Sequence, residues 1–382
     1  MAGACGYNPG IVSGYFRKSI AALKGYVPGE QPQTDGYIKL NTNENPYSPS
    51  PRVLSALRKA ANPSLRLYPE PLSDSLRSLA AATYGLGSEN VLVGNGSDEL
   101  LSILARCFVG PGDRVVYPVP TYSLYDTLID IQEGEKVTVD YSADFTLPEG
   151  IYSERASLTF LCNPNSPSGT LTSLEEIERL ARSISGILVV DEAYIDFAEG
   201  ERVSAIPLIR TFPNLIVLRT FSKSFSLAGM RIGLAFACEE IISGMFKVKD
   251  SYNVNRLSLV AAVAALQDSR WMMRNVRRIQ RSRKKLSRGL EKMGFRVFPS
   301  QANFVMARQK GRSLRGLYEE LKRRKILVRY FDVPGLDDSL RITVGAPDEI
   351  KTLLHQMEEI GKAGRSTQGL ASSSPLTDSD TG

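Results

Sequence analysis

A lysine with hydroxyl and guanidinium neighbours is the strongest chemical signal in this chain. The segment RTFSKSFSLAGMRIG, residues 219–233, places Lys223 between two serines and ahead of Arg231. It follows an apolar run at residues 215–218 that has the composition of a buried strand. Because open α/β sheets bind ligands at the carboxyl ends of their strands, this pattern predicts an amine nucleophile surrounded by oxyanion ligands.

Polar segments follow three other predicted strands. Asp191 closes the apolar run at 187–190, and a buried aspartate is costly unless it meets a positive group. The segment LCNPNSPSG, residues 161–169, is rich in turn residues whose Asn and Ser side chains can face a polar ligand. In VGNGSDEL, residues 93–100, a glycine turn leads into a helix start, where free backbone N–H groups can hold a phosphate.

Taken together, these segments require one ligand with three features. The helix start and Arg231 require an anionic phosphate, Asp191 requires a ring cation, and Lys223 requires an aldehyde. Pyridoxal phosphate has all three. The chain has no G-x-G-x-x-G fingerprint at this turn and no Walker A sequence, so neither a dinucleotide enzyme nor an NTPase is supported.

The composition is that of an ordinary globular enzyme. The chain has 382 residues, 42% of them hydrophobic and 23% charged, and a net charge of +6 that permits anionic partners. Its four cysteines form no CxxC pair, which argues against a zinc site and a redox pair. His355 is the only histidine, so an HExxH metal site is excluded and we expect another residue type to transfer protons. No apolar run is long enough to cross a bilayer, and the first residues lack a secretory signal, so we expect a cytoplasmic protein.

Alternating strand and helix patterns predict an α/β fold. Apolar runs with strand composition occur at residues 91–93, 114–117, 136–139, 158–161, 187–190, 215–218 and 232–237. Helical patterns lie between several of them, at residues 100–108, 174–184 and 203–212. This order predicts a large domain over residues 46–270, built on an open, mostly parallel sheet flanked by helices.

Beyond residue 270 the pattern is that of a smaller α+β domain, which we place at residues 271–363. Helices are expected at 270–293 and 313–324 and from 347 onward, with strands at 303–307, 326–330 and 340–344. We expect residues 1–45 to form an N-terminal arm that joins this domain. Residues 364–382 are rich in Ser, Gly and Thr and are expected to be a disordered tail.

The most basic stretch, RNVRRIQRSRKKLSR at residues 274–288, lies within the expected long helix. Apolar residues such as Val276, Ile279 and Leu286 recur at spacings of three and seven and fall on one stripe of that helix. No aromatic residues interleave with the charges to stack bases. We therefore interpret the charges as the solvated face of a packed helix, and expect neither a nucleic-acid nor a membrane partner.

Several motifs occur in a fixed order along the chain. They are LNTNENPYSPSP (40–51), YPEP (68–71), GNGSDE (94–99), NPNSPSG (163–169), DEAY (191–194), SKSFSLAGMRIG (222–233) and LRITVG (340–345). This order resembles the fold-type I aminotransferases, which depend on pyridoxal phosphate, and within them the histidinol-phosphate aminotransferase family. The resemblance covers roughly residues 20 to 360.

The resemblance implies roles for three residues around the cofactor ring. Lys223 condenses with the cofactor aldehyde and later moves the proton. Asp191 pairs with the pyridinium nitrogen and keeps it protonated, since a nearby negative charge favours the cationic form. Tyr194 donates to the 3′-oxygen of the ring.

The resemblance also implies a phosphate site and a shared subunit interface. The phosphate is expected to be held by Ser97, the Asp98 backbone, Ser222 and Arg231. Tyr122 is expected to stack on the ring. Tyr68 matches a tyrosine that reaches the phosphate of the neighbouring subunit, which implies a homodimer with shared sites.

One turn departs from the family pattern. The family normally has NPTG, whose asparagine bonds the ring oxygen, whereas this chain has Ser166 in that place. Asn165 is adjacent, and we take it as the candidate for this cofactor contact. Which of the two residues makes the contact stays open at this point.

The resemblance implies transamination between L-histidinol phosphate and 2-oxoglutarate. Arg341 matches the arginine that binds the α-carboxylate of amino-acid substrates such as glutamate. The substrate phosphate needs its own cation, and we assign it to Arg329 in ILVRYF, with Arg341 able to serve either anion. Tyr26, in GYVPGEQP, is a further candidate for the substrate wall.

Three alternatives share parts of this pattern. Threonine-phosphate decarboxylase has a similar fold and a phosphate-bearing substrate. A general aromatic amino-acid aminotransferase accepts broader substrates. A regulator that keeps the fold as a sensor belongs to a different class, but no DNA-binding module precedes the aminotransferase-like segment.

Overall fold

The larger of two sheets contains the strands that the sequence predicted as parallel. A computed structural model describes residues 13–23, 25–200, 203–333 and 335–371. The seven-stranded sheet has the order β2-β8-β7-β6-β5-β3-β4, in which β8 runs antiparallel to β2 and β7 and the other neighbours are parallel. Its strands are β2 (Val91–Gly94), β3 (Arg114–Val119), β4 (Glu135–Asp140), β5 (Leu158–Cys162), β6 (Ile187–Asp191), β7 (Leu215–Thr220) and β8 (Gly233–Phe236).

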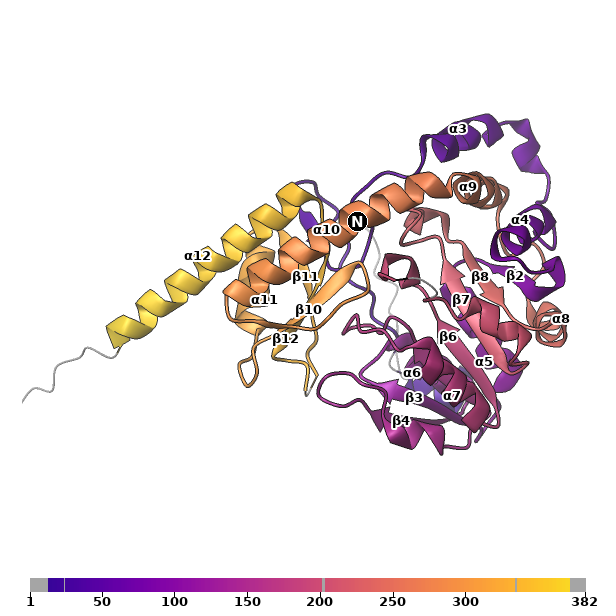
Figure 1. Cartoon of the computed structure of the whole chain (residues 1–382), viewed down its shortest axis with the longest axis horizontal. Helices are drawn as coiled ribbons and strands as arrows, with labels where there is room; N and C mark the ends of the chain where they lie inside the picture. Colours follow the sequence, from indigo (N-terminus) through magenta and orange to yellow (C-terminus); the bar gives the residue numbers. More distant parts are fainter. Residues whose placement is uncertain (1–12, 24, 201–202, 334, 372–382) are drawn as a thin grey trace, which may run out of the picture.

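Both faces of this sheet are buried. Along β6, Leu188 and Val190 pack into one hydrophobic cluster and Val189 into another. Because successive side chains of a strand point to opposite faces, a continuous apolar strand must be covered on both sides. Helices provide this cover in Figure 1. They are α4 (Asp74–Tyr84), α5 (Ser97–Phe108), α6 (Leu124–Ile131), α7 (Leu174–Ser183), α8 (Glu239–Val248) and α9 (Arg256–Gln267), with α3 (Pro51–Ala60) packed on α9 and the short α2 (Lys18–Ala22) near α6.

Local sequence explains where α7 begins. The Ser173 hydroxyl accepts a hydrogen bond from the Glu176 N–H at 3.2 Å, and the Glu176 carboxylate accepts one from the Ser173 N–H at 3.1 Å. This reciprocal pair satisfies two backbone donors that the first turn of a helix leaves free. The helix prediction for residues 174–184 is therefore confirmed, with its end at Ser183.

The helix predicted at residues 203–212 is not present as an α-helix. The chain forms a short 3-10 helix over Ile206–Arg210 instead. Ser204 and the Ala205 N–H bond to the Glu192 carboxylate, which fixes the entry to this segment. Pro213 disfavours helical backbone at the preceding residue, so the exit is fixed as well.

The smaller sheet has five strands in the order β1-β11-β12-β10-β9. Its strands are β1 (Ile38–Leu40), β9 (Arg296–Val297), β10 (Phe304–Arg308), β11 (Ile326–Tyr330) and β12 (Ser339–Thr343). β1 pairs parallel with β11, so the N-terminal segment adds an edge strand to a sheet built from the end of the chain. This pairing concerns residues 38–40 of the expected arm over residues 1–45, of which 1–12 and 24 lie outside the described part of the chain. The domain boundaries stay a prediction.

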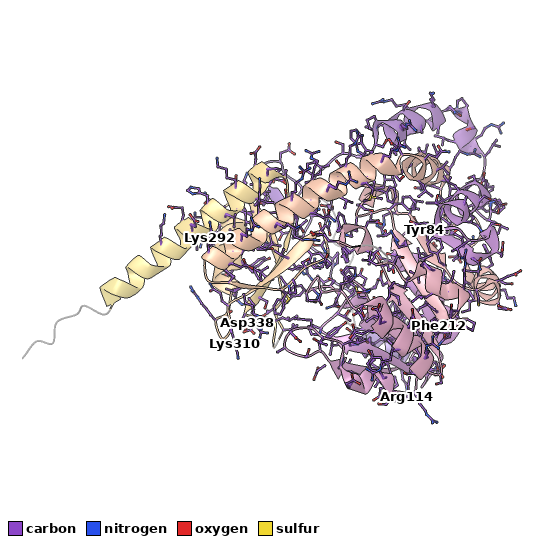
Figure 2. The ribbon with its side chains drawn as sticks, viewed as in Figure 1. Tyr84, Arg114, Phe212, Lys292, Lys310 and Asp338 are labelled. Carbon is purple, nitrogen blue, oxygen red and sulfur yellow. The ribbon has the colours of Figure 1, made fainter. Side chains whose placement is uncertain are left out.

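Long helices connect and flank the two sheets. In Figure 1, α10 (Ser269–Lys292) runs from α9 to the smaller sheet, where α11 (Arg315–Arg323) and α12 (Pro347–Ala371) also lie. Lys292, the last residue of α10, lies at the small-sheet end of that helix (Figure 2). α12 continues beyond residue 364, where the sequence predicted an unstructured tail, and residues 372–382 lie outside the described part of the chain.

The interpretation of the basic stretch as one face of a packed helix is confirmed. Val276, Ile279, Leu286 and Leu290 of α10 are fully buried, while most of the arginines and lysines of the helix are exposed. Arg283 is the exception, because its guanidinium is buried and donates to the Ala302 carbonyl at 2.8 Å.

No helix among the described residues is both long and apolar enough to cross a membrane. Nor does this part of the chain bring together three or more His, Cys, Asp or Glu side chains that could hold a metal ion.

Candidate active site

A cavity of about 160 Å³ lies between the carboxyl ends of β5, β6 and β7 and the smaller sheet. Cys162, Asp191 and Thr220 end these three strands and line it, and Arg329 and Arg341 line it from β11 and β12. Except for Asn165 and Tyr68, every predicted site residue lies along its wall. These residues are Tyr26, Ser97, Asp98, Tyr122, Asp191, Tyr194, Ser222, Lys223, Arg231, Arg329 and Arg341.

Lys223 lies just beyond the end of β7 with its amine in the cavity wall. Its Nζ donates to the Thr42 carbonyl at 3.2 Å and lies 5.7 Å from the centre of the Tyr194 ring. Enclosure by the protein, together with the positive charge of Arg341, lowers the pKa of the Lys223 amine to about 8. Near neutral pH about a tenth of this amine is therefore unprotonated, compared with well under about a thousandth at the usual pKa of 10.5, and the unprotonated form is the one that attacks an aldehyde.

Asp191 is the buried carboxylate of the site, with 3% of its surface exposed. It accepts hydrogen bonds from the Ala193 N–H at 3.1 Å and from the Tyr125 hydroxyl at 3.2 Å. Burial raises the pKa of this carboxyl to about 6, because these two hydrogen bonds offset only part of the lost hydration. It forms no ion pair with another described residue, so a cationic ligand atom would supply the missing charge.

An anion cradle lies at the start of α5. The helix begins at Ser97 without a side-chain cap, so its first N–H groups are free to bind a ligand. Arg231 reaches the same place, with Nη1 donating to the Ser222 hydroxyl at 3.2 Å and Nη2 to Asp98 at 3.0 Å. Two hydroxyls, a guanidinium and a helix start together match the ligands that a phosphate group takes.

Glycine at position 96 allows this close approach. Gly96 has a φ of +85°, and a Cβ added there would lie 2.6 Å from Nη2 of Arg231. Any side chain at this position would strain the backbone and push the guanidinium out of the cradle.

Tyrosines form the walls between the amine and the cradle. The Tyr122 hydroxyl donates to Asp98 at 3.2 Å, and its ring contacts the edge of Tyr26 at 5.9 Å between ring centres. The Tyr194 hydroxyl accepts a hydrogen bond from Nδ2 of Asn43 at 3.0 Å. Burial raises the pKa of Tyr194 above its usual range, so its hydroxyl keeps its proton and can donate it to a ligand oxygen.

Two arginines lie side by side on the small-sheet wall. Arg329 and Arg341 are direct partners in the register of β11 and β12. Arg341 donates to the Ser166 hydroxyl and to the Asn41 carbonyl, both at 3.0 Å, and its buried Nε has no partner among the described residues. Neither arginine forms an ion pair with a described carboxylate, so this wall favours an anionic group.

The geometry of the 161–169 turn bears on the predicted cofactor contact of Asn165. The Asn165 side chain is buried behind the cavity wall, where it donates to the Pro120 carbonyl and accepts from the Thr121 hydroxyl. Ser166 lines the cavity in its place. The amide of Asn165 is therefore used to hold the turn, and the hydroxyl of Ser166 is the group available to a ligand.

Tyr68 lies outside this cavity, and its side chain is 76% exposed. Its ring stacks on Tyr252 with 4.5 Å between ring centres. A tyrosine in this position cannot serve the site of its own chain, so its predicted role at a neighbouring subunit's site stays a proposal.

Sequence reasoning missed two residues that orient the site. Asn43 holds the Tyr194 hydroxyl and has a positive φ of 57°. It lies in the LNTNENPYSPSP motif, which by itself indicates no role for this residue. Tyr125, which holds Asp191, lies in the apolar pattern of α6 and gave no signal of its own. Its ring stacks on Phe160 at 4.5 Å, which explains why it resembles a core residue.

The donor set fits pyridoxal phosphate. The amine of Lys223 has a lowered pKa, Asp191 is a buried carboxylate that lacks a cation, and the start of α5 with Arg231 forms an anion cradle. These groups lie around one cavity and match the aldehyde, ring nitrogen and phosphate of that cofactor.

Comparison with known proteins agrees with this geometry. The family model described as aminotransferase class I and II matches residues 35–357. Histidinol-phosphate aminotransferase 1 of Trichormus variabilis is 42% identical over 351 residues, covering 91% of this chain and 99% of that protein. The histidinol-phosphate aminotransferase of Citrifermentans bemidjiense is 45% identical over 348 residues, covering 91% of this chain and 98% of that protein.

A solved structure of a protein with the same name also matches this chain. The crystal structure of histidinol-phosphate aminotransferase from Sinorhizobium meliloti in complex with pyridoxal-5′-phosphate matches with a TM-score of 0.82 and 26% sequence identity. The match covers 91% of this chain and 98% of that chain.

Proposed function

Because this chain belongs to the class I and II aminotransferases and uses pyridoxal phosphate, we propose that it is a histidinol-phosphate aminotransferase. The reaction is reversible amino transfer between L-histidinol phosphate and 2-oxoglutarate, giving imidazole-acetol phosphate and glutamate. The observation that carries this choice within the family is the pair of arginines, Arg329 and Arg341, on the cavity wall. Both substrates of the pair carry an anion that such a wall can bind.

Lys223 is the proposed catalytic residue. When bound, pyridoxal phosphate supplies an aldehyde that carries the amino group and a ring that withdraws electrons. The lowered pKa of Lys223, about 8, raises the fraction of unprotonated Nζ near neutral pH, and this is the form that can accept a proton from the substrate Cα. The Thr42 carbonyl, 3.2 Å away, holds this Nζ at one place on the wall.

The remaining cofactor contacts follow from the cavity. The Asp191 carboxylate would pair with the ring nitrogen, and Tyr125 holds that carboxylate in place. Tyr194, oriented by Asn43, would donate its hydroxyl proton to the ring oxygen. The phosphate would be held by Ser97, the Asp98 backbone, Ser222 and Arg231, with Tyr122 against the ring.

At the substrate end, we assign the phosphate of histidinol phosphate to Arg329 and the carboxylate of glutamate to Arg341. The hydrogen bond of Arg341 to Ser166 keeps its guanidinium aimed into the cavity. Tyr26 would form the wall next to the imidazole, since its ring lies against Tyr122.

We also propose a homodimer with shared sites. Apolar side chains are exposed around Tyr68, among them Leu65, Leu67, Leu72 and Tyr252. A second copy of the chain would cover this surface and bring Tyr68 to the partner's phosphate site. Mixing Lys223→Ala with Tyr68→Phe protein tests this, because exchange of subunits would restore one intact site and part of the activity. No recovery in mixtures that light scattering shows to contain dimers would contradict it.

A cytoplasmic location completes the proposal. Phosphorylated substrates are strongly charged and do not cross lipid bilayers unaided. The enzyme is therefore placed in the compartment where these substrates are made.

One coupled assay separates this function from its rivals. The purified enzyme with 2-oxoglutarate is offered L-histidinol phosphate, L-histidinol, L-phenylalanine and O-phospho-L-threonine, and both glutamate and carbon dioxide are measured. We expect the highest kcat/KM with histidinol phosphate and a loss of about tenfold to a hundredfold without its phosphate, the value of one or two charged hydrogen bonds. Equal turnover of phenylalanine would favour an aromatic aminotransferase. In a parallel reaction that omits 2-oxoglutarate, carbon dioxide from phosphothreonine would favour the decarboxylase.

A further inference from the structure

A buried group of charged side chains lies next to the active site without lining the cavity. The proposed mechanism gives these side chains no role. Glu192 follows β6, Arg219 lies in β7, and Asp196 lies in the 3-10 helix Ile195–Phe197. Glu192 is 1% exposed and Arg219 is 7% exposed. Charges buried to this degree require several polar partners.

The Glu192 carboxylate is fully supplied with donors. It accepts hydrogen bonds from the Ser204 hydroxyl at 2.7 Å and the Ala205 N–H at 2.5 Å, and Nη1 of Arg219 lies 3.5 Å away. The Arg219 guanidinium also lies over the ring of Tyr84, 5.6 Å from its centre. Tyr84 is labelled in Figure 2, beside the strands of the larger sheet. The arginine is therefore held from two sides.

Asp196 joins this group to the segment that carries the amine. Nη2 of Arg219 donates to one oxygen of Asp196, and the Ser224 hydroxyl donates to the other at 2.5 Å. Ser224 directly follows Lys223 and is 1% exposed. In addition, Nδ2 of Asn45 donates to the Lys223 carbonyl at 3.0 Å.

Three members of this group lie within two residues of a proposed cofactor residue. Glu192 follows Asp191, and Ser224 follows Lys223. Asp196 lies two residues after Tyr194. In each of these three places the cofactor residue lines the cavity, while its neighbour is held by the buried contacts described above.

Stability alone is a weak reason for such a group. Replacing a buried ion pair by apolar residues of similar volume is often neutral or stabilising, because burial costs the charges their hydration. A role in geometry explains the group better, since the reacting amine follows β7 and the Asp191 carboxylate ends β6, so their separation depends on contacts between two strand ends. A misplacement of about 1 Å in an active site can lower the rate by about a hundredfold.

We propose that Ser224, Asp196, Arg219 and Glu192 form a positioning network that holds Lys223 at a fixed place relative to Asp191 and Tyr194. This inference rests on the proposed function, because the network would position the Lys223 amine that the proposed function treats as catalytic. None of the four is a catalytic residue, since none of them lines the cavity.

Ser224→Ala tests the network with Ser226→Ala as its matched control. Both serines lie in the SKSFS segment, and the buried Ser226 hydroxyl has no hydrogen-bond partner among the described residues. The purified enzymes are loaded with pyridoxal phosphate, and the pH midpoint of the cofactor absorbance band, kcat and KM are measured. This midpoint reports the surroundings of the Lys223 nitrogen and does not respond to general stability.

We expect Ser224→Ala to bind one cofactor per chain but to show a displaced pH midpoint and a kcat lower by about tenfold or more, with KM for 2-oxoglutarate within about twofold. Ser226→Ala is expected to match the wild type in all three. Ser224→Thr, which keeps the hydroxyl, is expected to recover most of the kcat. If Ser224→Ala does not fold, Ser224→Cys carries the test, because the thiol has a similar shape but donates weakly.

A Ser224→Ala enzyme with the midpoint and kcat of Ser226→Ala would overturn the network. An unchanged midpoint and kcat in Ser224→Cys would overturn it equally. This failure differs from failure of the proposed function, in which the wild type itself would turn over no histidinol phosphate.

Discussion

Replacing Asp191 with asparagine separates two effects of the buried carboxylate: it lowers the stability of the cofactor-free protein, and it raises the affinity for the cofactor. In the cofactor-free protein, burial raises the pKa of this carboxyl from 3.8 to about 6. A group with a raised folded pKa contributes stability below its unfolded pKa and loses that contribution as the pH rises through the folded value. The cost of the carboxylate therefore develops between about pH 4 and pH 6 and is complete at pH 8.

The shift of about two units corresponds to an upper value of about 3 kcal/mol. Asparagine keeps an oxygen that can accept from the Ala193 N–H and the Tyr125 hydroxyl, but it carries no charge. We therefore expect Asp191→Asn to stabilise the cofactor-free protein at pH 8 and to have little effect at pH 4. With pyridoxal phosphate the sign reverses, and the affinity should fall by about tenfold to a hundredfold, since a charged hydrogen bond contributes about 1.5–3 kcal/mol.

Urea unfolding of the cofactor-free protein from pH 4 to pH 8 measures the first effect, and titration with pyridoxal phosphate measures the second. Asp140→Asn is the matched control, because Asp140 ends β4 as Asp191 ends β6 but is exposed. We expect this control to change neither quantity. A cofactor-free Asp191→Asn protein that is less stable than the wild type at pH 8 would refute the reasoning.

Three further predictions concern the amine, the cradle and the arginine wall. The rate at which the protein binds pyridoxal phosphate covalently should rise with pH around a midpoint of about 8, because burial lowers the pKa of Lys223. Stopped-flow absorbance measures this rate, and a midpoint near pH 10 would contradict the prediction. Gly96→Ala and Gly112→Ala both place alanine at a positive φ, so each should lower the free energy of unfolding by about 1 kcal/mol. Only Gly96→Ala should also weaken cofactor binding, by about tenfold in an equilibrium titration, because only its Cβ would meet Arg231. Arg341→Lys keeps the charge but loses the forked donor, so steady-state kinetics should show KM for glutamate raised about tenfold or more, and an unchanged KM would remove Arg341 from the substrate site.

Much of the large domain could be predicted because its strands are buried on both faces. Continuous apolar runs such as residues 187–190 leave little choice of structure, and the polar residue that ends each run must then lie at one edge of the sheet. Lys223, Asp191 and Arg231 were found for this reason, since each follows or faces the end of such a strand.

Other features depend on contacts that sequence spacing does not contain. The 203–212 segment has a helical pattern, but it forms only the short 3-10 helix over Ile206–Arg210, with Ser204 and the Ala205 N–H bonded to the distant Glu192 carboxylate. Asn165 and Ser166 are equally polar neighbours, and only the folded turn shows that Thr121 and Pro120 take the amide of Asn165.

The network behind the cavity was missed for a similar reason. Glu192 and Ser224 stand beside the reactive residues in the sequence, and their side chains meet only through Arg219 and Asp196. A pattern of residue types cannot show such a connection, because it depends on which strands become neighbours in the sheet.

Borohydride reduction followed by mass spectrometry tests the central claim most directly. The wild-type protein and Lys223→Ala are loaded with pyridoxal 5′-phosphate, reduced, digested and mapped. The account predicts one pyridoxyl group per wild-type chain, attached to Nζ of Lys223, and none in the variant. A pyridoxyl group on a different lysine of the wild type, or a full equivalent on Lys223→Ala, would contradict it.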